Sequence, residues 1–330
     1  MQRLGRALWV VALALLTLWA TAALWIDGPA NRLMAGLLAA AVPVGALFLW
    51  RQSRRWGIWV AIGPALGVLL WWLQLAPRQD RQWTPEVAEL PRVEQAGNIL
   101  TVRNVRHFGY GATDAEATPG WETRTFDLAQ VTGADLLISF WGPTLYGHTI
   151  LSFHVEGQPP LAISIETRKE VGESYSALLG FFRQFELYYV VADERDVVGV
   201  RTRQRGEQVR LLHLDIRPQT AQQLLLRYAE SINALAAQPA WYNALTSNCT
   251  TTIERNANRV AAMDDPYDWR LLANGHLDER LREQHFLDTT MTLDALRRVS
   301  DITARAQAAD GAADFSQRIR AGIPGEAGMP

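Results

Sequence analysis

The chain has 330 residues, which is enough for one large domain or two of ordinary size. Its charges are unevenly distributed: residues 1–77 contain six Arg and one Asp, whereas residues 78–330 contain 26 basic and 33 acidic side chains. This acidic balance argues against nucleic acid as the main partner, because phosphate binding favours a basic surface. The single cysteine, Cys249, excludes an internal disulfide and any multi-cysteine metal site.

Three apolar stretches lie in the first 77 residues, at 7–26, 33–50 and 56–75. Each reaches the roughly 18–20 residues that a helix needs to cross a hydrocarbon core. A cleaved signal peptide has a shorter apolar core, of roughly 7–15 residues, and two further apolar stretches would not be expected after it. The sequence therefore predicts a membrane anchor of three transmembrane helices over residues 1–77.

Arginine bias sets the expected orientation of this anchor. Five arginines lie before the first stretch or between the second and third, namely Arg3, Arg6, Arg51, Arg54 and Arg55. Positively charged loops collect on the cytoplasmic side of a membrane. We therefore expect a cytoplasmic N-terminus and a multi-pass protein of the inner (cytoplasmic) membrane, with the larger part of the chain in the periplasm.

The remaining residues predict an α+β domain. Residues 78–94 are polar and contain prolines, as expected of a linker. Strands are expected at 98–106, 124–128, 135–141, 148–155, 161–167, 187–191, 197–201 and 209–216, with a Gly-Gln-Pro-Pro turn at 157–160 joining one pair into a hairpin. Helices are expected at 218–237 and 248–260 and in the charged segment 291–320. The domain then spans 95–320, followed by a flexible tail at 321–330.

Cys249 is the first candidate for chemistry. It follows Ser247 and Asn248 and precedes three threonines, at the expected start of a helix. A thiol in the first helical turn lies near the positive end of the helix dipole, which favours the thiolate. Asn248 could donate to an oxyanion or could cap the helix. The alternative for Cys249 is a small buried apolar residue.

A histidine could act as the base for this thiol. His148 opens an expected strand after a Gly-containing turn, which suits a group presented at a sheet edge. Glu166, on the paired strand, could accept the second N–H of the imidazole, and Ser164 has the same parity. Glu166 could instead form an ion pair with Arg168 or Lys169.

The other histidines are expected to be structural. His154 has Glu156 close by in sequence and is expected to be solvated or salt-bridged, and no partner pattern surrounds His107, His213, His276 or His285. No pair has the spacing HxxxH or HExxH, so neither a zinc site nor a cofactor is expected. The charge-dense run at 192–207 is expected to be a solvated strand edge and turn.

Three motifs resemble a known family: WGPTLYGHTILSFHV (141–155), ISIETRKE (163–170) and WYNALTSNCTT (241–251). Over about residues 95–320 the chain resembles the Lnb N-terminal periplasmic domain family. The resemblance implies a permuted papain-like or NlpC-like thiol fold, in which the histidine strand precedes the cysteine helix. By this resemblance Cys249 is the nucleophile and His148 the base, and Glu166 and Asn248 match motif positions. Weaker candidates for substrate binding come from the same motifs: Trp141, Tyr146, Ser164, Arg168 and Tyr242.

The resemblance also implies lipoprotein N-acylation, in which Cys249 takes an acyl chain from a membrane phospholipid and passes it to an amine, such as a lipoprotein N-terminus. Two alternatives remain: a cysteine peptidase or amidase acting on peptidoglycan or peptides, and a non-catalytic membrane-anchored binding domain. An acyltransferase should have an apolar channel beside Cys249, and Tyr242, Leu245, Phe181 and Phe182 are candidates to line it. The oligomeric state does not follow from the sequence.

Overall fold

A computed structural model describes residues 2–52, 61–110, 118–261 and 268–325. The chain forms two compact units. The first comprises residues 1–79 together with 174–186, and the second comprises residues 80–173 and 187–330.

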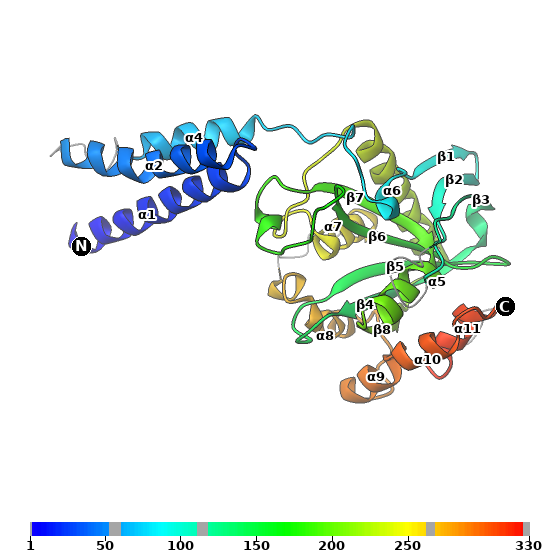
Figure 1. The fold of residues 1–330 in the computed structure, drawn as a ribbon. Coiled ribbons are helices and arrows are strands. Elements are labelled where there is room, and N and C mark those ends of the chain that lie inside the picture. Colours follow the sequence, from blue (N-terminus) through cyan, green and yellow to red (C-terminus); the bar gives the residue numbers. More distant parts are fainter. Residues whose placement is uncertain (1, 53–60, 111–117, 262–267, 326–330) are drawn as a thin grey trace. The chain divides into compact units, whose positions relative to one another are not determined.

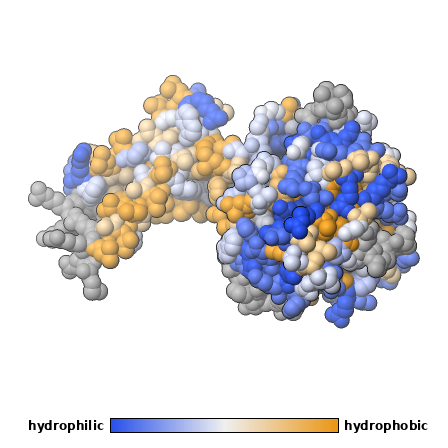
Figure 2. Space-filling model, turned by 90° about the horizontal axis from the view of Figure 1, so that it is seen from below, coloured by the Kyte–Doolittle hydropathy of each residue, from blue (hydrophilic) through white to orange (hydrophobic). Residues whose placement is uncertain are grey.

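The first unit is built from apolar helices: α1 (Gln2–Ile26), α2 (Arg32–Gln52) and α4 (Gly63–Leu73). Among the described residues, 7–26 of α1 and the whole of α2 are long and apolar enough to cross a membrane. Figure 2 shows apolar side chains over much of the surface of these helices. The first five residues of the third expected span, 56–75, lie outside the described residues. Its described part contains α4, which has only 11 residues.

Small side chains let these helices approach closely: Ala20, Ala23 and Ala65 are almost fully buried where they pack. Segment 174–186 joins this unit from a distant part of the chain and contains the short turn η4 (Leu179–Phe181). Its Phe182 packs among the helices. Asp27, between α1 and α2, accepts hydrogen bonds from Gln184 Nε2 at 2.8 Å and from the indole of Trp72 at 2.6 Å. Segment 174–186 is thus fixed to the helices through Asp27.

The second unit contains one eight-stranded sheet. Its strands are β1 (Arg92–Ala96), β2 (Ile99–Arg106), β3 (Trp121–Asp127), β4 (Val131–Phe140), β5 (His148–Val155), β6 (Leu161–Arg168), β7 (Glu186–Asp193) and β8 (Gln208–His213). Their order is β1-β2-β7-β6-β5-β4-β8, and β3 pairs with β2. The β2–β7 pair is parallel, whereas β4, β5, β6 and β8 pair antiparallel, so the sheet is mixed. The predicted α+β class is confirmed.

Helices cover both faces of this sheet (Figure 1). On one face α6 (Pro218–Ala237) and α7 (Cys249–Ala261) pack on a core that includes Leu151, Phe153 and Tyr228. On the other, α5 (Glu194–Gly199), α10 (Thr303–Ala308) and α11 (Phe315–Arg320) pack on a core that includes Ile150 and Val197. The remaining elements are α8 (Leu277–Glu283), α9 (Leu293–Ser300), η1 (Pro85–Val87), η3 (Leu128–Gln130), η6 (Trp269–Leu271) and η7 (Asn274–His276). Because side chains point alternately to the two faces of a strand, successive residues of β5 and β6 enter the two cores in turn.

The strand predicted at 197–201 is wrong. These residues form the end of α5 and the π-helical turn η5 (Val200–Gln204). The Asp193 side chain accepts a hydrogen bond from the backbone N–H of Arg195 at 2.8 Å and so caps α5. The three valines Val197, Val198 and Val200 fit either period, which is why the sequence pattern misleads here. The run is not solvated either, because Glu194, Asp196 and Arg201 are each at most 1% exposed.

The ends of the second unit are more ordered than the sequence indicated. The segment expected as a linker, 78–94, contains η1 and the start of β1, and Val87 within it is 1% exposed. At the other end Ile323 is buried in the core shared with α10 and α11. Residues 326–330 of the expected tail lie outside the described residues.

Candidate active site

Cys249 is the first residue of α7, and Asn248 caps that helix. Asn248 Oδ1 accepts a hydrogen bond from the backbone N–H of Thr251 at 2.9 Å, and its Nδ2 donates to the Ala244 carbonyl at 2.7 Å. The Asn248 amide, which the sequence offered as an oxyanion donor, is thus engaged in capping. Cys249 itself is 7% exposed and lies against the sheet.

Cys249 and His148 meet in the structure, although 100 residues separate them in sequence. The thiol and the imidazole lie close enough to shift each other's pKa, and Thr149 also acts on the thiol. Burial by itself raises the pKa of the Cys249 thiol, but the adjacent His148 outweighs it and lowers that pKa to about 6. Burial likewise disfavours the imidazolium, yet Cys249 and Glu166 raise the pKa of His148 to about 9. Near neutral pH the pair is therefore a thiolate and an imidazolium.

Both candidates for the third residue lie at the imidazole. The β5–β6 register sets Ile150 opposite Ser164, and the same register continued for two residues sets Glu166 opposite His148. His148 Nε2 is 2.6 Å from Ser164 Oγ and 3.5 Å from Glu166 Oε1. Ser164 Oγ in turn donates to Glu166 Oε1 at 3.1 Å. Ser164 thus makes the closer contact, and Glu166 supplies the negative charge.

Arg201 holds the Glu166 carboxylate, a contact that the sequence did not reveal. Arg201 Nη2 donates to Glu166 Oε1 at 2.8 Å, and Arg201 is 1% exposed. Burial opposes ionisation of Glu166, but Arg201 and His148 outweigh it and hold the pKa of this carboxyl well below its usual range. Glu166 is therefore an anion beside the imidazolium at neutral pH. Arg201 lies in η5, within the run that the sequence indicated to be solvated.

The two cations that the sequence offered to Glu166 have other partners. Arg168 is buried and donates to the backbone carbonyls of Val87, at 3.0 Å, and Ala88, at 2.8 Å. Lys169 forms an ion pair with Glu86 at 3.2 Å. Arg168, a weak candidate for substrate binding, thus secures the segment around η1.

Asn274 in η7 connects the loop before His148 to the helix that carries Cys249. Its Oδ1 accepts from the backbone N–H of Gly147 at 2.6 Å, and its Nδ2 donates to the Gly147 carbonyl at 2.6 Å and to Thr250 Oγ1 at 2.8 Å. Beside it the chain passes so close to Thr144 that a Cβ on Gly275 would lie 1.6 Å from the Thr144 carbonyl oxygen. Sequence reasoning missed Asn274 because nothing local distinguishes it from an ordinary turn residue.

Large apolar side chains are exposed on three loops: 141–147, which leads into β5, 240–248, which leads into α7, and the loop around η6. Their exposed members are Trp141, Leu145, Tyr146, Leu245 and Trp269. Trp141 and Tyr146 are 58% and 57% exposed, so both are available to a substrate, whereas Tyr242 is buried. The loops that lead to the two central residues thus carry apolar groups at the surface.

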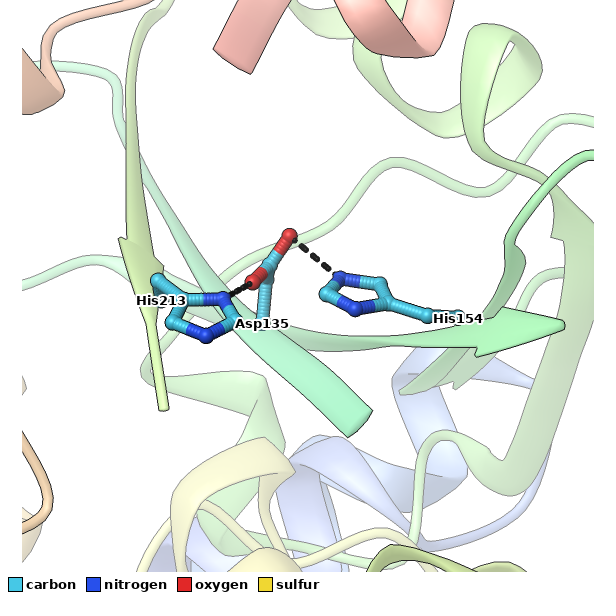
Figure 3. Close-up of side chains that lie close together, drawn as sticks. All are labelled: Asp135, His154 and His213. Atoms are coloured by element: carbon cyan, nitrogen blue, oxygen red, sulfur yellow. Dashed lines mark hydrogen bonds and ion pairs between the residues drawn. The ribbon is translucent and has the colours of Figure 1, made fainter. Parts of the chain in front are cut away.

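A second cluster joins Asp135, His154 and His213 (Figure 3). Asp135 lies between the imidazoles, with Oδ2 2.9 Å from His154 Nε2 and Oδ1 2.8 Å from His213 Nδ1. Arg320 Nε donates to Asp135 Oδ2 at 2.7 Å. His154 is thus buried rather than solvated, and of the two expected roles the structure favours the salt bridge, with Asp135 and not Glu156 as the partner. Three ligand atoms lie within 4.8 Å of one another, but the Arg320 guanidinium is already the cation at this carboxylate.

Comparison with known proteins places this site in a family. Residues 117–275, which contain His148, Glu166 and Cys249, match the family model of the Lnb N-terminal periplasmic domain. These residues belong to the Lnb N-terminal periplasmic domain family. No curated protein and no solved structure matches the chain. The Lnb domain here runs from just before β3 into η7, and with the two apolar helices α1 and α2 it makes the chain a membrane-anchored protein with a periplasmic domain.

Proposed function

We propose that this chain is a thiol acyltransferase of the inner membrane, which moves an acyl chain from a phospholipid to an amine, such as the N-terminus of a lipoprotein. The observation that carries the proposal is the contact between Cys249, at the start of α7, and His148, which in turn contacts Ser164 and Glu166. A thiolate held beside a base and a carboxylate is the arrangement required for covalent acyl transfer.

The first half-reaction forms a thioester. The Cys249 thiolate attacks the carbonyl carbon of a phospholipid ester, and the carbonyl oxygen becomes an oxyanion. Backbone N–H groups in the first turn of α7 have no partner within the helix, so the N–H of Cys249 is the donor we assign to this oxyanion. The ester C–O bond then breaks, and the His148 imidazolium gives its proton to the departing alcohol oxygen.

The second half-reaction forms an amide. The amine nitrogen attacks the thioester carbonyl and loses a proton to the now neutral His148, and the C–S bond breaks to return the thiolate. The imidazolium and thiolate are thereby restored together, and no net proton is gained or lost. Water in place of the amine would give hydrolysis, which is how the peptidase or amidase alternative would use the same residues.

Several features favour a membrane lipid as the donor. The helices α1 and α2 anchor the chain in a membrane, and the loops leading to Cys249 and His148 expose Trp141, Leu145 and Leu245. The arginine distribution supports a cytoplasmic N-terminus and three spans, with α4 as part of the third. The order of the histidine strand β5 before the cysteine helix α7 supports a permuted papain-like fold.

The proposal is tested by intact-protein mass spectrometry of the purified full-length protein after incubation with phospholipid. We expect a fatty-acyl adduct that hydroxylamine removes, no adduct on Cys249→Ser, and none on His148→Asn. His107→Asn, a matched change at an exposed histidine, should acylate like the wild type. Absence of an adduct on a wild-type protein whose Cys249 reacts rapidly with iodoacetamide would favour the peptidase, and an unreactive Cys249 would favour a binding domain.

A further inference from the structure

An apolar cavity of about 130 Å³ lies between the sheet and the helices α6, α7 and α8. Its walls include Leu136 and Leu151 from the sheet, Leu224 from α6, Ile253 and Ala257 from α7, and Leu281 from α8. The cavity lies on the face of the sheet that α7 covers, within the core that contains Cys249. Phe182, which the sequence offered as a lining residue, packs instead among the helices of the first unit.

The cavity begins next to the nucleophile. Thr250 is part of its wall, and Thr250 Oγ1 lies 3.8 Å from Cys249 Sγ. Ile253 follows Cys249 by four residues, so it lies one helical turn further along the same side of α7. With a rise of about 1.5 Å per residue, the wall formed by α7 extends roughly 15 Å, from Thr250, the residue after Cys249, to Val260. A chain attached to Sγ can therefore run along α7 into this space.

We propose that this cavity binds the first carbons of the acyl chain carried by Cys249, an assignment that rests on the proposed function. Its volume is close to that of an engineered cavity of about 150 Å³ that binds benzene, so it accommodates about six carbons of an unbranched chain. A charged or amide-bearing group in the same space would lose its hydration against a mostly apolar wall, in which the carboxylate of Glu254 already accepts from Arg280 and Asn258. The cavity thus selects a hydrocarbon chain over a peptide segment.

The test uses N-alkylmaleimides, because Cys249 is the only cysteine and this reaction needs no acyl donor. In the full-length protein we expect the alkylation rate to rise by up to about fourfold per methylene as the alkyl group grows from methyl to hexyl, and then to level off. Ala257→Phe fills the cavity and should abolish the rise while leaving the N-methylmaleimide rate unchanged. Ala234→Phe, the same change at an exposed position of α6, should behave like the wild type. All variants are compared in the same detergent, so that partitioning of the longer maleimides into micelles affects each alkylation rate equally.

A second variant changes the volume of the cavity in the opposite direction. Leu281→Ala enlarges it, so the levelling point should move to longer chains. A flat series in the wild type, or a rise that neither substitution changes, would overturn the assignment. The outcomes also separate the cavity from the reaction. A rise without any acyl adduct supports the cavity and contradicts the acyltransferase, whereas an acyl adduct with a flat series supports the enzyme and contradicts the cavity.

Discussion

Arg201 Nη2 donates a 2.8 Å hydrogen bond to Glu166 Oε1, the same oxygen that lies 3.5 Å from His148 Nε2. Glu166 therefore lies between two cations when His148 is protonated. Arg201 keeps the carboxylate ionised, whereas its own positive charge disfavours the imidazolium. The Glu166 carboxylate thus stabilises the His148 imidazolium and offsets the repulsion that the Arg201 guanidinium exerts on it.

Neutralising Glu166 should weaken His148 as an acid. In Glu166→Gln the pKa of His148 should fall, because the amide supplies no charge while Arg201 remains. We expect the alkaline limit of acyl transfer to move to lower pH and the rate at pH 10, above the pKa of His148, to drop by on the order of tenfold, the effect of about one pKa unit. Glu230→Gln, at an exposed position of α6, is the control. An unchanged pH profile in Glu166→Gln would show that Ser164 alone orients the imidazole.

The reactivity of Cys249 should have an unusual pH dependence. Because the thiol pKa is about 6, iodoacetamide alkylation should rise through that pH, well below the range of an ordinary thiol. Acyl transfer also needs the imidazolium as an acid, so its rate should fall again as pH rises through about 9. In His148→Asn nothing offsets the effect of burial, which raises the pKa of the Cys249 thiol. The pH midpoint for alkylation should therefore move above pH 8. A wild-type midpoint near that of a free thiol would contradict the ion pair.

The contact between η7 and the loop before His148 should be intolerant of even one methyl group. In Gly275→Ala the new Cβ would overlap the Thr144 carbonyl, so the loop must move and carry His148 with it. A displacement of about 1 Å at a reacting group can cost roughly 10²-fold in rate, and we expect a loss of that order. Gly142→Ala lies in the same loop with open space around it and should retain activity. Equal activities of the two variants would show that the contact with η7 does not position the loop before His148.

The Asp135 cluster should contribute to stability rather than to chemistry. In Asp135→Asn the buried Arg320 loses one charged partner and keeps Glu194, so the free energy of unfolding should fall by about 1.5–3 kcal/mol. Because Arg320 and the two histidines outweigh burial and hold the pKa of Asp135 well below 3.8, this contribution is present above that pH and is lost as the pH falls further. Denaturant unfolding at pH 7 measures the difference, and the pH midpoint for Cys249 alkylation should not change. A variant as stable as the wild type would contradict the assignment.

Local sequence patterns predicted the elements whose signals are complete within a short window. Helix α6 has the predicted bounds, 218–237, because a proline opens it and apolar residues recur at helical spacing. The hairpin of β5 and β6 was also predicted, from the alternation of apolar residues along both strands and from the turn between them. The predicted meeting of His148 with Glu166 depended on this hairpin, and its register places the two residues opposite each other.

Contacts across long stretches of sequence could not be predicted in the same way. Arg201 and Asn274 reach the site from segments whose residues resemble surface turns, and their roles emerge only when η5 and η7 pack against the sheet. The cavity beside Thr250 was missed for the same reason, since its walls come from α6, α7, α8 and two strands. An apolar residue that lines a cavity and one that fills a core look the same in sequence.

Segment 174–186 has a practical consequence for producing the protein. Because this segment belongs to the helical unit, the chain passes between the two units three times, at residues 79–80, 173–174 and 186–187. Deleting residues 1–79 would leave Phe182, Arg183 and Gln184 without their helical partners, so a shortened chain would expose an apolar patch in water. Detergent or nanodisc preparation of the whole chain is therefore the safer source of material for crystallisation or cryo-electron microscopy.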